Sequence, residues 1–392
     1  MKTWILALSA VLVMHTGAHA DFDSCKEQIK AQAAAQGISA ATLARALDGL
    51  QPNDALSFIG VQPEFSTPIW DYLSGLVDDE RVIDGKQRFA EYRQAAMAAQ
   101  NRFGVDAAAV VAVWGVESDF GNSFGSRPVI QSLTTLACIP NRRSDYFRHE
   151  LMSALKIVDR GDVKLEDFKG SWAGAFGNTQ FMPSTFLSLA VDMDGDGRRD
   201  VVGSVPDALG STANFLRKAG WVSGLPWGFE VKLQANYRGP SGRGGKQDLS
   251  VWAGRGLTRI DGSPLSGSGA YGLLLPAGPQ GPAFLVSRNF DAFYSYNAAE
   301  SYALAIGVLS DRLKGGPGIV TPWPTDDPGL TRAERREVQA RLEQRGYDVG
   351  GKHDGVMGTK TREAIAAYEQ KNGLKRDGRA GKKLLAALRG GT

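Results

Sequence analysis

Residues 107–116 are almost wholly apolar, and a carboxylate, Glu117, follows them directly. A helix that is apolar nearly all round is typical of a buried helix, so we predict one over residues 105–117. Glu117 then lies either at the surface, which is the usual place for such a residue, or in an apolar cleft. In a cleft its charged form is poorly solvated and its pKa rises, so it can hold a proton near neutral pH, as a general acid must.

The strongest companion motif is the glycine-rich segment 170–184. Closely spaced glycines let the backbone approach a ligand, and Ser171 and Gln180 offer neutral hydrogen bonds. Three aromatic residues of the segment offer flat apolar faces that suit sugar rings: Trp172, Phe176 and Phe181. The alternative interpretation is a glycine-rich turn that is covered by aromatic core residues.

A third motif is the acidic loop 192–200, which follows the spacing of an EF-hand calcium loop. Oxygen ligands at relative positions 1, 3, 5, 7 and 9 come from Asp192, Asp194, Asp196, the Arg198 carbonyl and Asp200. The twelfth position holds Gly203 instead of Glu, and Asp207 is the candidate for the missing ligand. We expect a structural Ca²⁺ site, because the loop is far from Glu117 in sequence; a solvated acidic turn is the alternative.

Two weaker clusters carry polar and aromatic groups. Arg142, Arg143 and Tyr146 precede a predicted helix and can bind an acidic ligand, although a solvated helix start is the simpler interpretation. Tyr296, Asn297 and Tyr302 surround a strand-to-helix turn, where core packing is the alternative. The chain shows no Ser/His/Asp signature, no zinc-ligand spacing and no phosphate-binding loop.

The first twenty residues look like a secretory signal. Lys2 supplies a positive charge, residues 4–13 form an apolar core that is too short to span a bilayer, and residues 18–20 (Ala-His-Ala) fit a cleavage site. We therefore expect cleavage after Ala20 and a periplasmic protein. The residues before Cys25 lack the pattern of a lipidated cysteine, and no later segment is apolar for long enough to cross a membrane.

The composition is that of a globular protein of about two or three domains, with 43% hydrophobic and 22% charged residues in 392. The formal net charge of +3 gives no reason to expect a nucleic-acid partner. Two cysteines remain after export, Cys25 and Cys138. Either a disulfide or two buried thiols is compatible with their spacing.

The chain divides into a helical body, a β-rich insert at about residues 222–290, a Gly/Pro-rich linker at 315–328 and a small helical module at 329–392. The fold class is therefore mainly α. Helices are predicted, by pattern and caps, at residues 40–50 (after Ser39), 84–103, 105–117, 144–158, 206–219 and 298–313. Short strands are predicted at residues 229–237, 249–253, 257–260, 271–275 and 284–286.

Together the motifs resemble, in order and in spacing, the family B lytic murein transglycosylases of bacteria. The resemblance covers roughly residues 22–315 and implies a lysozyme-like helical catalytic domain over residues 21–314. The C-terminal segment resembles a three-helix peptidoglycan-binding domain through motifs at Val338–Leu342, Gly346-Tyr347 and Thr361–Ile365.

The resemblance implies cleavage of the bond between N-acetylmuramic acid and N-acetylglucosamine without water. Glu117 aligns with the single catalytic acid, which would protonate the bridging oxygen and then accept the proton of the muramic 6-hydroxyl as a 1,6-anhydro ring closes. The positions that match the family's cleft are Ser171, Gln180, Phe181, Met182, Arg142, Arg143, Tyr146, Tyr296, Asn297, Tyr302 and, as a weaker match, Tyr72. The calcium ligands that match are Asp192, Asp194, Asp196, Arg198 and Asp207.

The residues agree with this reaction in one respect. Ordinary glycosidases use two carboxylates, and here one Glu stands out. Asp119 is two residues on, and it points away from Glu117 if the helix continues. Two alternatives stay open, a muramidase that hydrolyses the same bond and a wall-binding protein without catalysis. We expect a monomer that needs no cofactor for chemistry, with glycan strands and possible cell-wall-synthesis proteins as partners.

Overall fold

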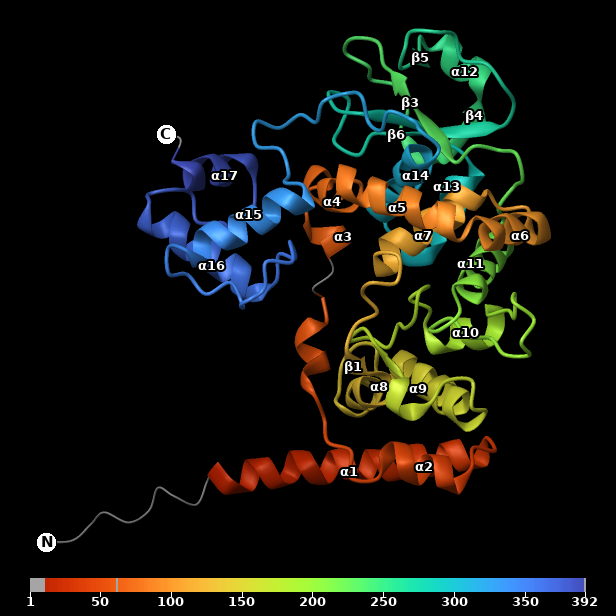
Figure 1. Cartoon of the computed structure of the whole chain (residues 1–392), viewed down its shortest axis with the longest axis vertical. Coiled ribbons are helices and arrows are strands. Elements are labelled where there is room, and N and C mark those ends of the chain that lie inside the picture. Colours follow the sequence, from red (N-terminus) through yellow and green to blue (C-terminus); the bar gives the residue numbers. More distant parts are fainter. Residues whose placement is uncertain (1–10, 61–62, 391–392) are drawn as a thin grey trace, which may run out of the picture. The chain divides into compact units, whose positions relative to one another are not determined.

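The computed structural model describes residues 11–60 and 63–390 (Figure 1). The chain forms two compact units, one within Met1–Val61 and Glu117–Asn214 and the other within Gln62–Val116 and Phe215–Thr392. Part of the predicted signal peptide, residues 1–10, lies outside the described residues. Within the described ranges, no helix combines the length and the apolar character that crossing a bilayer requires.

The first unit is built around α8 (Val129–Cys138) and α9 (Ser144–Asp159), two helices that pack against each other (Figure 1). Leu133, Leu151 and Leu155 are fully buried, as expected for the facing sides of such a pair. Its α-helices are α1 (Val11–Ala35), α2 (Ala40–Leu47), α8 (Val129–Cys138), α9 (Ser144–Asp159), α10 (Pro183–Leu189) and the start of α11 (Val205–Lys218). Short elements complete it: η1 (Asp54–Phe58), β1 (Arg127–Pro128), η2 (Leu165–Asp167) and β2 (Lys169–Gly170).

Covalent and polar links hold α1 and α2 in this unit. Cys25 on α1 and Cys138 at the end of α8 form a disulfide, which decides between the two alternatives that the sequence left open. Ser39 is the N-cap of α2, as predicted, and its hydroxyl donates to Asp159 at 2.6 Å. The start of α2 is thereby fixed to the end of α9.

The second unit contains the predicted buried helix, α7 (Ala107–Ser118), up to Val116. The single helix predicted over residues 84–103 is wrong, because the chain forms two helices that meet at Tyr92, whose φ of −101° and ψ of 22° interrupt the first helix. The other helices of its body are α3 (Pro63–Ser66), α4 (Ile69–Leu76), α5 (Asp79–Glu91), α6 (Arg93–Phe103), α13 (Arg288–Asn297) and α14 (Glu300–Leu313).

The β-rich insert is a five-stranded antiparallel sheet in the order β4-β6-β7-β3-β5. In the central pair Phe229 lies opposite Leu285, and β6 pairs with β7 through Leu273 and Leu285. The strands are β3 (Gly228–Lys232), β4 (Gly242–Asp248), β5 (Thr258–Arg259), β6 (Ala270–Leu274) and β7 (Ala283–Val286).

One strand prediction in this insert is wrong, and one strand was missed. Residues 249–253 form a helix, α12 (Leu249–Gly254), whose buried Leu249 and Trp252 lie three residues apart and face the sheet core together. A short apolar run cannot separate these two structures by periodicity alone. Strand β4 was missed because its sequence, GRGGKQD, has no alternating apolar residues; it pairs with β6 at the edge of the sheet.

The C-terminal module consists of α15 (Arg332–Glu343), α16 (Thr359–Lys371) and α17 (Lys382–Arg389), as the sequence predicts. Thr331 and Glu334 form a capping box at the start of α15. The module has its own core, in which Val338, Ile365 and Leu388 are fully buried.

An ion-pair network joins this module to α4 and α5 of the same unit. Arg379 donates to both oxygens of Asp71, at 2.6 and 2.8 Å, and also to Asp327. Arg336 pairs with Glu80 at 2.5 Å, and the Asp78 carboxylate accepts the Arg332 amide at 2.7 Å. The connection is therefore more than a chain linker.

The predicted linker has neither helix nor strand, but it is anchored to the sheet. The amides of Val320 and Thr321 donate to the two oxygens of Glu230 on β3, at 2.7 and 2.8 Å. Glu230 is 9% exposed, so its carboxylate is a buried acceptor that these two amides satisfy.

Candidate active site

Glu117 is the penultimate residue of α7 and is partly buried. Residues 107–114 of this helix are each at most 3% exposed, which confirms the buried helix. Asp106 receives the Ala108 amide at 2.8 Å at the start of the helix, and the buried Arg81 donates to the carbonyl of Gly115 near its end. A cation at the C-terminal end satisfies a free carbonyl and is favoured by the helix dipole.

The helix stops abruptly after Ser118. Asp119 and Phe120 have φ values of 52° and 54°, and Gly121 follows at 87°. A left-handed conformation costs a non-glycine residue about 1–2 kcal/mol, so surrounding contacts must hold two such residues in a row. Because the helix does not continue, the condition under which Asp119 would point away from Glu117 is not met.

Ser118 connects the end of α7 to the glycine-rich segment. Its hydroxyl donates to the carbonyl of Asn178 at 2.9 Å, and Ser118 is 1% exposed. Asn178 in turn donates its side-chain amide to the carbonyls of Val201 and Val202, each at 3.1 Å. The residue next to Glu117, the glycine-rich segment and the chain after the acidic loop are thus linked by hydrogen bonds.

The glycine-rich segment folds back on itself through bridges at Gly170–Phe176 and Phe176–Phe181. A Cβ on Gly170 would lie 2.1 Å from the carbonyl oxygen of Ala175, so only glycine fits there. Ser171 accepts the Ala175 amide at 3.1 Å on its hydroxyl. This predicted site residue therefore has a structural task within the turn.

Gln180 also holds the turn. It adopts a φ of 48°, and its side chain donates to the carbonyls of Gly177 and Phe124 at 2.9 and 3.2 Å. Phe181 is 2% exposed and Phe176 fully buried, so both rings pack in the core, as in the alternative interpretation of this segment. Met182, next along the chain, is partly buried and can still line a surface.

The start of α9 gathers the predicted arginine cluster. The guanidinium of Arg143 lies 4.3 Å from the centre of the Tyr146 ring, which is 38% exposed, and Arg142 is exposed beside it. Burial raises the pKa of the Tyr146 phenol, and the nearby Glu150 adds to the effect. Asn141 fixes the turn by donating to two carbonyls at the end of α8.

The remaining predicted cleft residues belong to the second unit. Tyr296 and Tyr302 stack with ring centres 6.2 Å apart, and Tyr302 is 2% exposed. Asn297 donates its amide to Glu64 at 3.1 Å. Tyr72 lies on α4 and is partly buried.

The acidic loop brings three of the predicted ligands together. Carboxylate oxygens of Asp192, Asp194 and Asp196 lie within 4.8 Å of one another. Loop amides organise them, since Asp192 accepts from Gly195 at 2.6 Å and from Gly197 at 2.8 Å. Clustered carboxylates around a tight Gly-containing turn fit a hard cation such as Ca²⁺.

Asp207 lies beneath this loop and is fully buried. Its two oxygens accept the amides of Met193 and Asp200, both at 2.7 Å. Burial raises the pKa of its carboxyl group, against the effect of these amide hydrogen bonds. Among the described residues it is not a member of the three-carboxylate cluster.

Sequence reasoning missed Glu150, which supports the glycine-rich segment. Glu150 is 2% exposed and accepts from the amide and the hydroxyl of Ser184, at 2.9 and 2.7 Å. A signal was present, because Glu150 lies three residues after Phe147 and four before Ala154, on the apolar face of α9. A carboxylate on a buried face needs a partner.

Comparison with known proteins assigns the class. Residues 21–311 match the family model of the transglycosylase SLT domain, and residues 331–388 match a model described as a peptidoglycan binding domain. The chain therefore belongs to the transglycosylase SLT domain family.

Particular relatives narrow this class. Membrane-bound lytic murein transglycosylase B of Escherichia coli is 33% identical over 243 residues, which are 61% of this chain and 65% of that protein's length. SltB3 of Pseudomonas aeruginosa, solved with NAG-anhNAM-pentapeptide, shares 44% identity at a TM-score of 0.75 over 94% of this chain and 99% of its own. E. coli Slt35, solved with calcium, shares 28% identity at a TM-score of 0.64 over 75% of this chain and 92% of its own.

Proposed function

We propose that this protein is a periplasmic lytic transglycosylase of peptidoglycan, exported by a signal peptide that is cleaved after Ala20. It cleaves the β-1,4 bond between N-acetylmuramic acid and N-acetylglucosamine. The observation that carries the proposal is the placement of Glu117: a partly buried carboxylate at the end of a buried helix, joined through Ser118 to the glycine-rich segment. Family membership and the resemblance to SltB3 support it.

The reaction needs one carboxyl group and no water. Glu117 first gives its proton to the glycosidic oxygen, and the bond between this oxygen and C1 of the muramic sugar breaks. The 6-hydroxyl of the same sugar then attacks C1, and its proton passes to the Glu117 carboxylate. The products are a free N-acetylglucosamine 4-hydroxyl and a 1,6-anhydro ring, and the catalyst returns to its starting protonation state.

Product analysis with Glu117→Gln tests this mechanism. Wild-type enzyme acting on purified sacculi should release anhydro ends, which mass spectrometry finds one water lighter than reducing ends. The variant should lose at least about 10²-fold in rate, because general acid–base catalysis contributes at least that much. Reducing ends would establish a muramidase instead, and unchanged turnover of the variant would remove Glu117 from the chemistry.

We further propose a structural Ca²⁺ bound by Asp192, Asp194, Asp196 and the carbonyl of Arg198, with Asp207 as the candidate further ligand. The carboxylate cluster supports it, as does the calcium named for Slt35. A chelator should lower the melting temperature of the wild-type protein, because an ion that binds only the folded state stabilises it. Asp194→Asn should melt at a lower temperature in calcium and respond less to the chelator; an unchanged wild-type melt would refute the site.

The peptidoglycan binding match at residues 331–388 supports a second contact with the wall. The glycan strand that we propose as substrate carries a short peptide on each muramic acid, and the ligand named for SltB3 has such a pentapeptide. Such a strand combines sugars with peptides that carry carboxylates, so the enzyme can bind the sugars and the peptides at separate surfaces.

A further inference from the structure

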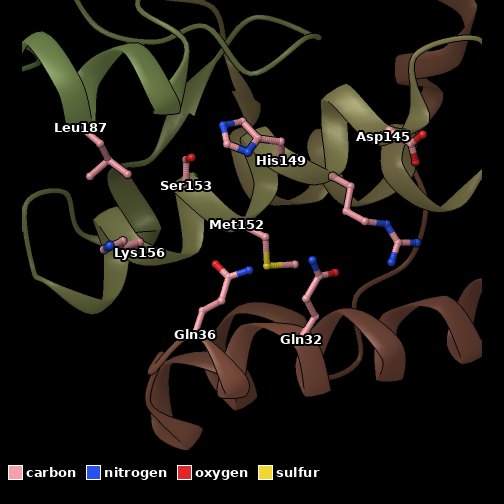
Figure 2. A pocket seen from close by; sticks show the side chains of 9 residues that line it. Gln32, Gln36, Asp145, His149, Met152, Ser153, Lys156 and Leu187 are labelled. Carbon is pink, nitrogen blue, oxygen red and sulfur yellow. The ribbon is translucent and has the colours of Figure 1, made fainter.

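A pocket of about 360 Å³ lies on the first unit, between α9 and the end of α1 (Figure 2). Gln32 on α1 and Gln36 just past its end extend towards α9, with Met152 between the two helices. Leu187 of α10 borders the pocket near Lys156. None of the predicted cleft residues lines this pocket, so it is separate from the site described above.

The lining of the pocket is cationic. Arg148 and Lys156 bring two permanent positive charges against the single carboxylate of Asp145, for a formal charge of +1 with His149 neutral. The other acids of α9 are occupied elsewhere, since Glu150 binds Ser184 and Asp159 binds Ser39. His149 and Lys156 are exposed, so their nitrogen donors can reach a ligand.

The neutral part of the lining suits a peptide better than a sugar. Gln32 and Gln36 present amides, which pair with peptide N–H and C=O groups. Met152 is 6% exposed and gives an adaptable apolar floor for small side chains. Among the described residues, no Phe, Tyr or Trp lines the pocket, in contrast to the Tyr146 surface at the start of α9.

We propose that this pocket binds the carboxylate-bearing peptide attached to the glycan strand, an inference that rests on the proposed function. Carboxylates pair with the guanidinium of Arg148 and the ammonium of Lys156, which both line the pocket. A peptide on a sugar that is bound near Tyr146 is long enough to reach Lys156, because these two residues are ten residues apart on one helix, about 15 Å. An extended five-residue peptide spans up to roughly 17 Å.

The test compares two substrates. One is a purified glycan strand that carries its peptides, and the other is the same strand stripped of peptides by an amidase. Combined replacement with Arg148→Gln and Lys156→Gln should raise KM about tenfold on the peptide-bearing strand, the loss of roughly one charge-assisted hydrogen bond. The kcat on this strand and both constants on the stripped strand should stay as in wild type.

Two further variants keep the test interpretable. Lys156→Gln alone changes an exposed side chain and should raise KM in the same direction without lowering the melting temperature, whereas Arg148 also lies near the Cys25 sulfur, at 3.7 Å. Arg160→Gln is the matched control, because Arg160 is exposed one helical turn beyond Lys156 and does not line the pocket. It should leave KM unchanged on both strands.

The outcomes separate the two proposals. An unchanged KM on the peptide-bearing strand, or an equal rise on both strands, overturns the peptide site while wild type still makes anhydro ends. If wild type releases no anhydro ends from either strand, the proposed function itself fails.

Discussion

Single side chains decide how the candidate site is held. Ser118 connects the end of the Glu117 helix to Asn178, and Glu150 fixes Ser184 after the glycine-rich segment. Both are buried polar groups whose hydrogen bonds are satisfied inside the protein. Such groups stabilise a particular local arrangement, because the alternative is an unpaired polar atom without water.

The carboxylate of Glu150 gives a prediction at this scale. Glu150→Ala leaves the amide and the hydroxyl of Ser184 without their acceptor and should lower the free energy of unfolding by about 2 kcal/mol. Chemical denaturation measures the change. Glu166→Ala is the control, since Glu166 is 64% exposed and its pair with Arg45 is loose at 3.6 Å; it should change stability by less than about 0.5 kcal/mol. Equal effects would contradict a supporting role of Glu150.

At the scale of elements, helix-to-helix contacts depend on ion pairs as well as on apolar cores. In the C-terminal module Glu337 on α15 accepts from Arg389 on α17 at 2.5 and 2.9 Å, and from Arg341 at 2.6 Å. These bonds, that of Arg389 first, lower the pKa of Glu337 from its ordinary 4.5 to about 2. The last helix is thereby attached to the first at the edge of the module core.

The lowered pKa of Glu337 predicts that the stability of the C-terminal module depends on pH. A carboxylate with a lowered folded-state pKa contributes stability that is present above pH 4.5 and is lost as the pH falls towards 2. The protection factors of the α17 amides, which compare their exchange with that of an unfolded chain at the same pH, should therefore fall between pH 4.5 and 2.5. Glu337→Gln should have lower protection factors already at pH 5 and lose less protection as the pH falls, so parallel profiles of protection against pH for the two proteins would refute the link.

The attachment of the C-terminal module to α4 gives a second prediction at this scale. Asp71 is 7% exposed, so Arg379→Gln leaves a buried carboxylate without its cation and should cost about 3 kcal/mol. The melting temperature of the full chain should fall, and amides of α4 and α17 should exchange faster. Lys383→Gln breaks an exposed pair, with side chains 61% and 85% exposed, and should have little effect.

At the scale of the whole molecule, each compact unit combines segments that are far apart in the sequence. Residues 329–390 share a unit with α4, α5 and the sheet, and the linker is tied to Glu230. The disulfide closes a separation of 113 residues within the other unit. The C-terminal module is therefore a docked part of the body and differs from a freely tethered domain.

Truncation after Pro328 tests this docking. Removal of the module should weaken retention on sacculi, and it should also lower the melting temperature, because Asp71 and Asp78 lose the groups that cover them. Asp71→Asn in the truncated chain should recover part of that loss, since it removes a charge without a cation. A truncated chain as stable as the full one would show that the module is only tethered.

Several elements could be predicted because their local sequence pattern is compatible with only one type of structure. The buried helix before Glu117, the Ser39 cap and the helical character of the C-terminal module follow from periodicity and capping, which neighbouring residues determine. Residues 249–253 and strand β4 could not be assigned in this way. An apolar run of five residues fits a helix or a strand, and a glycine-rich edge strand is stabilised by its neighbour rather than by its own pattern.

The sequence alone determined the types of groups present and their order: one carboxylate after an apolar helix, a glycine-rich segment, an acidic loop and a C-terminal helical module. Only the tertiary structure decided that Cys25 and Cys138 are bonded, that Phe181 and Tyr302 are core residues, and that Arg379 binds Asp71. Burial and pairing depend on residues that are far apart in the chain. A local pattern therefore indicates which functional groups the chain offers, and packing decides which of these groups come into contact.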